Sequence, residues 1–168
     1  MKTYSRISGF SLYELILVMV ITAIIAVVAT PSLINYLQER RLIGTTMQLY
    51  YALQEAKTEA IKNNTLIYVS FQTGSSWCYG LNSGSNCNCS TANSCAIGTT
   101  QAPSGGLITL VATGLSNNAV QFDPRQGAAS GSVTMTFTNN QGIAMTVEIG
   151  LLGSITVCSS QVEGYSGC

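Results

Sequence analysis

The sequence predicts an α+β fold in which one long N-terminal hydrophobic helix precedes, and packs on, a head of antiparallel strands. Up to about Lys62 the apolar residues recur at helical spacing. Beyond that point they alternate with a period of two in consecutive short segments, and all six cysteines fall in this second half. A helix followed by a run of strands is typical of α+β domains, because the sheet can cover the apolar face of the helix.

The composition of the 168-residue chain argues against an enzyme. Only 8% of the residues are charged, against about 25% in an average soluble domain. There is no histidine, which excludes a Ser-His-Asp triad and imidazole metal ligands. Asp123 is the sole aspartate, and no plausible set of catalytic residues accompanies it. We therefore expect a protein without catalytic residues, cofactor or metal.

The second half of the chain is also poor in cations. After Asn63 the charged residues are Asp123, Arg125, Glu148 and Glu163. A surface that binds nucleic acid through phosphates needs clustered lysine and arginine residues. We do not expect DNA binding by this region.

The N-terminus combines a basic start with a long apolar run. Lys2 and Arg6 precede a stretch without any charge from Leu15 to Leu37, which has the length of a membrane helix. Basic residues on that side place the N-terminus in the cytoplasm and the cysteines in the compartment where disulfides form. In a secretory signal peptide the apolar run precedes the cleavage site, whereas here the small residue Gly9 lies before the run.

Glu14 stands at the start of this apolar run, where a carboxylate is costly unless it has a partner. Two interpretations remain open from the residue alone. The carboxylate can be solvated at the level of the lipid headgroups. Alternatively, it pairs with a cation inside an assembly.

Residues 9–15, Gly-Phe-Ser-Leu-Tyr-Glu-Leu, resemble the processing site of type IV pilins and type II secretion pseudopilins. The resemblance implies that a prepilin peptidase cleaves after Gly9 and methylates the new N-terminal Phe10. It also implies that Glu14 pairs with the N-terminal amine of a neighbouring subunit and that Pro31 kinks the helix. On this basis the chain divides into a leader (1–9), a transmembrane and filament-core helix (10–32) and a periplasmic pilin head (33–168).

Within the head, the helix is predicted to continue as an amphipathic segment over 33–62. One face is formed by residues at spacings of three and four: Leu42, Thr46, Leu49, Leu53, Ala56 and Ala60. Asn63 and Asn64 are expected to end it. Strands are predicted at 66–72, 107–112, 119–122, 132–138, 142–149 and 153–159, with a sheet over 107–159. Residues 139–142 (Asn-Asn-Gln-Gly) indicate a hairpin turn.

The remaining segment, 73–106, is expected to be an irregular loop rich in cysteine, glycine and serine. The six cysteines are predicted to form disulfides: Cys78, Cys87, Cys89, Cys95, Cys158 and Cys168. A zinc site at the first four is the alternative, although they lack paired C-x2-C spacing. Cys158 and Cys168 are expected to pair and to close a loop over 158–168. The pairing of the other four stays open, except that a bond between Cys87 and Cys89 would be strained.

Trp77 and Tyr79 flank the first cysteine of this loop. Either they anchor the loop to the sheet or they form an exposed contact surface.

The second half resembles the FimU/FimT group of minor pilins, which is related to the H-type pseudopilin of type II secretion. The segments that carry the resemblance are WCYGLNSGSNCNC, FDPRQG, TFTNNQG and GSITVCS. It implies a minor pilin that helps to initiate assembly of a type IV pilus within a tip complex. The implied partners are other minor pilins, the major pilin and the prepilin peptidase. The implied location is the bacterial inner membrane, and later the pilus at the cell surface.

Two alternatives follow from the same resemblance. One is an H-type pseudopilin of a type II secretion system. The other is a DNA-binding pilin for natural transformation, in which a Gly-Arg-x-Arg motif contacts DNA. The matching residues here are Gly153, Ser154, Ile155 and Thr156, so both arginines are absent and we do not transfer that role.

Overall fold

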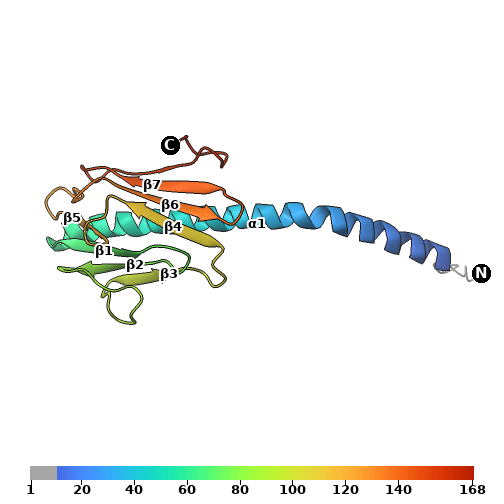
Figure 1. Cartoon of the computed structure of the whole chain (residues 1–168), viewed down its shortest axis with the longest axis horizontal. Coiled ribbons are helices and arrows are strands. Elements are labelled where there is room, and N and C mark those ends of the chain that lie inside the picture. Colours follow the sequence, from blue (N-terminus) through green and yellow to red (C-terminus); the bar gives the residue numbers. More distant parts are fainter. Residues whose placement is uncertain (1–10) are drawn as a thin grey trace, which may run out of the picture. The chain divides into compact units, whose positions relative to one another are not determined.

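The computed structural model describes residues 11–168, apart from the side chains of residues 28–32. One helix, α1 (Leu12–Asn63), is followed by eight strands (Figure 1). The strands are β1 (Ile67–Gln72), β2 (Cys78–Ser83), β3 (Gly98–Gln101), β4 (Ile108–Thr113), β5 (Ala119–Phe122), β6 (Val133–Asn139), β7 (Ala144–Ile149) and β8 (Ile155–Cys158). The long helix and the antiparallel strands confirm the predicted fold class.

The chain forms two compact units, one ending at Leu37 and the other comprising Gln38–Cys168. We call the described part of the first unit, residues 11–37, the N-terminal segment and the second unit the head. The hydrophobic core lies in the head, and α1 contributes to it from Leu42 onward.

The predicted apolar face of α1 is the centre of that core. All six residues of the face have no exposed surface: Leu42, Thr46, Leu49, Leu53, Ala56 and Ala60. The single polar member, Thr46, donates its hydroxyl to the Leu42 carbonyl at 2.9 Å, which satisfies the buried group. The helix ends at Asn63, and Asn64 follows with φ of 50°, a conformation that asparagine tolerates and that stops a helix.

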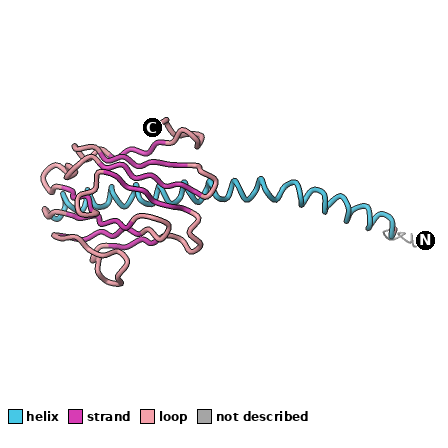
Figure 2. Tube along the Cα trace, viewed as in Figure 1, coloured by secondary structure: helices cyan, strands magenta, loops and turns pink. Residues whose placement is uncertain are grey.

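The strands form two sheets, although the sequence suggested one. β3-β2-β1-β5 make the first and β4-β6-β7-β8 the second, and all their pairings are antiparallel. Figure 2 shows both groups of strands beside the head part of α1. Alternating residues reveal which face of a strand is buried, but they do not reveal its neighbours, which depend on contacts distant in sequence.

The expectation of an irregular loop over 73–106 was wrong for two stretches, which form β2 and β3. β2 pairs with β1 along its whole length. Its first four residues are buried on both faces, so the alternation of apolar and polar residues that marks a half-exposed strand is missing. β3 has the sequence GTTQ, which contains no large apolar residue and therefore gives little strand signal.

Trp77 and Tyr79 anchor this region in the core, which decides between the two interpretations of these residues. Their side chains are 1% exposed and stack with ring centroids 6.1 Å apart. The Trp77 ring also meets Phe137 of β6 edge-on at 5.1 Å, and its indole N–H donates to the Ile108 carbonyl of β4 at 3.0 Å. Trp77 therefore joins the first sheet to the second.

The hairpin between β6 and β7 turns at the predicted residues. The Asn139 side-chain oxygen accepts hydrogen bonds from the backbone N–H groups of Gln141, at 3.0 Å, and Ile143, at 2.9 Å. Gly142 takes φ of 81°, which is readily adopted only by glycine. The side chain of Asn139 thus holds the turn together from within.

We predict that Leu49→Ala lowers the free energy of unfolding by about 2–5 kcal/mol, because it leaves a cavity in the core that α1 shares with the strands. Leu49 has no exposed surface, whereas Leu152, in the turn between β7 and β8, is 83% exposed. Leu152→Ala is the matched control and should change stability by less than about 0.5 kcal/mol. Urea unfolding of the purified variants measures both, and equal effects would contradict the central role of the α1 face.

Candidate functional site

Glu14 lies in the first turn of α1, and its side chain is exposed. The unpaired N–H groups and the dipole at a helix N-terminus favour a carboxylate at this place. Gly9 and Phe10, where the sequence predicts processing, lie outside the described residues. The helix continues through Pro31, whose side chain also lies outside the description, so a kink there stays a prediction.

The N-terminal segment exposes its large apolar side chains. Their exposed fractions run from 43% at Leu17 to 79% at Leu12. Soluble monomers rarely expose a contiguous apolar surface of this kind, and such surfaces usually mark contacts with proteins or lipids. The segment therefore offers a surface that other apolar groups can cover, with one carboxylate at its start.

In the part of the chain that the structure describes, no helix combines the length and apolar character that a bilayer crossing requires.

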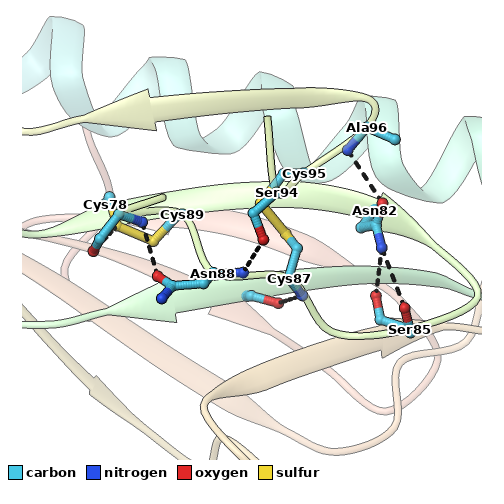
Figure 3. The surroundings of a disulfide bond; sticks show 11 residues. Cys78, Asn82, Ser85, Cys87, Asn88, Cys89, Ser94, Cys95 and Ala96 are labelled. Atoms are coloured by element: carbon cyan, nitrogen blue, oxygen red, sulfur yellow. Dashed lines mark hydrogen bonds between the residues drawn. A yellow bond between two sulfur atoms is a disulfide. The ribbon is translucent and has the colours of Figure 1, made fainter. Parts of the chain in front are cut away.

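All six cysteines are paired in disulfides: Cys78–Cys89, Cys87–Cys95 and Cys158–Cys168 (Figure 3 shows the first two). The last is the pair that the sequence predicted, and the first two resolve the choice that it left open. No cysteine is free, so none is present as the thiolate that a four-cysteine metal site needs. Among the described residues, no other group of ligands is arranged to hold a metal ion.

The first two disulfides hold the loop between β2 and β3 against the first sheet. Cys78 lies in β2, and the backbone N–H of Cys87 donates to the Ser70 hydroxyl of β1 at 3.1 Å. The Asn82 side chain ties both ends of the loop, since it donates to the Ser85 carbonyl at 3.0 Å and accepts from the Ala96 N–H at 3.1 Å (Figure 3). These contacts order a loop that has little apolar material of its own.

Gly80 makes the close approach of the second disulfide possible. A Cβ atom at this position would clash with the Cys95 sulfur and would lie 3.2 Å from the Cys87 sulfur. Sequence reasoning missed Gly80, because a glycine within a strand does not by itself reveal which group approaches it.

The residues that match the DNA-binding motif of some relatives form a turn and part of β8 in this chain. The carbonyl of Gly153 accepts a hydrogen bond from the Lys57 amine of α1 at 2.8 Å. Ile155 is buried. The amine of Lys57, the nearby cation, is thus engaged by the backbone.

Two titratable groups in the head have clearly shifted pKa values, and both shifts have structural causes. The hydrogen bond from Lys62 is the largest cause that lowers the pKa of Glu59, at the exposed end of α1. Burial raises the pKa of Tyr79 above its ordinary value. Neither group belongs to a set of residues that suggests acid–base chemistry.

The chain thus combines a helix whose N-terminal segment is apolar and exposed with a disulfide-bonded head of two sheets. Residues 45–153 match the family described as "Type II transport protein GspH". Because this match spans well over half of the chain, the protein belongs to that family.

Two crystal structures of the type IV minor pilin FimU from Pseudomonas aeruginosa (strain PAO1) are similar to this chain. The structure in space group P21 has a TM-score of 0.55 and 16% identity, and the match covers 71% of this chain and 89% of that one. The structure in space group P65 has a TM-score of 0.53 and 17% identity, with 69% and 91% covered. At this identity the similarity establishes the type IV pilin fold. No curated protein matches the sequence significantly.

We predict that Gly80→Ala destabilises the head by about 1–3 kcal/mol, because the added methyl group displaces the Cys87–Cys95 disulfide. Gly98 of β3 provides the control, since a Cβ there would meet nothing within 4 Å. Gly98→Ala should be neutral or slightly stabilising. Urea unfolding under non-reducing conditions distinguishes the two, and equal stability of the variants would argue against the crowding.

We also predict that peptide mapping by mass spectrometry without reduction recovers three linked peptide pairs. They should join Cys78 to Cys89, Cys87 to Cys95, and Cys158 to Cys168. A crossed pairing, free thiols or bound zinc would refute this arrangement.

Proposed function

We propose that the chain is a structural minor pilin that takes part in initiating assembly of a type IV pilus as part of a minor-pilin complex. The observation that carries this proposal is the exposed apolar surface of the N-terminal segment, with Glu14 at its start. The type IV pilin fold, which the FimU structure shares over 71% of this chain, supports it.

Packing of such helices side by side would remove their apolar surfaces from water. Each square ångström buried in this way contributes roughly 25 cal/mol, so a segment of this length provides a strong drive toward assembly. Apolar packing alone does not select one axial position of a helix against its neighbours. A pairing between charges does, because an unpaired charge among apolar groups is costly.

Glu14 is the only charged residue between Arg6 and Glu39. In the proposed filament its partner is the N-terminal amine of a neighbouring subunit, which becomes available once a prepilin peptidase has cleaved after Gly9 and methylated Phe10. A subunit would wait in the inner membrane, with its head in the periplasm, and then enter the pilus. Three disulfides in the head suit an oxidising compartment.

The choice of a minor pilin rests on the head. The two FimU structures are described as type IV minor pilins, and they share the fold of this chain over most of their length. The expected partners are therefore other minor pilins and the major pilin.

An H-type pseudopilin of a type II secretion system is the second candidate, because the matching family is described as a type II transport protein. Deletion of the gene separates the two. Loss of surface pili with normal protein secretion favours the minor pilin, and the reverse result favours the pseudopilin.

We predict that Glu14→Ala leaves the amount of the chain in the membrane fraction unchanged but lowers its amount in sheared pili at least tenfold. The reason is that the variant keeps the apolar surface and loses the charge that selects the position of the helix. Glu14→Gln should behave in the same way. Immunoblots of membrane and sheared-pilus fractions measure both quantities.

Glu55→Ala is the matched control for this experiment, since Glu55 is an exposed glutamate on the same helix. It should enter pili normally. Normal entry of both Glu14 variants would remove the proposed role of the carboxylate.

A further inference from the structure

The head contains a groove of about 490 Å³ beside the first residues that α1 contributes to the head. Its walls come from three places: α1, the connection between β3 and β4, and the turn between β6 and β7. The residues that matter here are Gln38, Arg41, Gly44, Leu107, Asn139 and Asn140. A Cβ atom at Gly44 would meet nothing within 4 Å, so the groove is open on the helix side.

Arg41 is the one charged residue that lines the groove. Its side chain is exposed, and among the described residues no carboxylate lies within ion-pair distance of it. The cation is therefore available to an incoming group of opposite charge.

Two buried polar atoms of the groove residues lack partners within the described chain: the Asn139 amide nitrogen and the Gln38 amide oxygen. The orientation of the Asn139 amide is not free, because its oxygen already accepts two backbone N–H groups of the turn. Its nitrogen therefore has no acceptor among the described residues, and a group that enters the groove can supply one. Buried polar groups in proteins nearly always have a partner.

The chemistry of the groove selects among possible occupants. A nucleic acid would require several cations, and the groove has one. A purely apolar ligand would leave the amide nitrogen of Asn139 and the oxygen of Gln38 unsatisfied. A polypeptide segment offers a carbonyl for the first, an N–H for the second, an acidic side chain for Arg41 and apolar side chains for Leu107.

We propose that this groove binds an acidic segment of a neighbouring subunit in the filament. The side-chain carboxylate of the segment meets the Arg41 guanidinium, and its backbone pairs with Asn139 and Gln38. The origin of the segment in a filament subunit rests on the proposed function, whereas the peptide-binding character rests on the groove itself.

Photo-cross-linking of the full chain, expressed in cells together with its filament partners, tests the proposal. A benzophenone amino acid at Thr45, which lines the groove, is compared with the same probe at Thr58, an exposed threonine of α1 outside it. The Thr45 probe should capture one segment that contains Asp or Glu from another filament subunit. Its yield should be at least tenfold above that of the Thr58 probe.

Charge variants show whether the carboxylate directs the contact. Arg41→Glu should lower the Thr45 cross-link at least tenfold, and Arg40→Glu, one position along the same helix, should not. Changing the acidic residue of the captured segment to lysine should restore the cross-link to Arg41→Glu. Asn139→Asp keeps the oxygen that holds the turn and removes the donor, so it should also lower the yield.

Thermal melting confirms that each variant is folded before its cross-link is scored. Equal yields at Thr45 and Thr58, capture of a segment without acidic residues, or no effect of Arg41→Glu would each overturn the proposal. Entry of the chain into filaments, measured in the same cells, separates the two hypotheses. Normal entry without the groove cross-link removes the groove contact alone, whereas a groove cross-link without entry contradicts the filament and the assigned source of the segment.

Discussion

The buried face of α1 from Leu42 to Ala60 is the contact on which the rest of the head depends. Two separate four-stranded sheets lie against it, and β2 and β3 in turn extend the first of them. A sheet with one apolar face must bury that face against another element, and the apolar face of α1 shares one core with the strands of both sheets. Trp77 adds a direct connection between the sheets through Phe137 and the Ile108 carbonyl, which makes the helix and both sheets one core.

The same helix meets two different requirements along its length. From Leu42 onward its apolar residues occupy one buried face, whereas in the N-terminal segment large apolar side chains are exposed all around. The strands of the head cover the apolar residues of the first part. The second part leaves apolar side chains that lipid or other helices can cover, which is the feature on which the proposed assembly role rests.

Disulfides and uncharged hydrogen-bonding side chains order the loop between β2 and β3, which has few charged or large apolar side chains. The loop between β2 and β3 contains mostly serine, asparagine and cysteine, and two disulfides together with the Asn82 side chain hold it to the first sheet. The bare backbone at Gly80 lets a disulfide lie directly on the strand. The groove beside Arg41 shows the opposite situation, since buried polar atoms of Gln38 and Asn139 have no partner among the described residues.

The sequence by itself determined the helix, its buried face from Leu42 to Ala60, the end of the helix at Asn63, most of the strands and the turn after Asn139. These features depend on local periodicity and turn chemistry, which are visible in neighbouring residues. It also predicted the pairing of Cys158 with Cys168, which the structure shows. Only the tertiary structure decided the division into two sheets, the strands within 73–106, the pairing of the other four cysteines and the groove at Arg41. The two sheets and the groove depend on segments that are distant in sequence, so no local pattern encodes them. The four cysteines lie close together in sequence, but their spacing permits several pairings and only the folded loop decides among them.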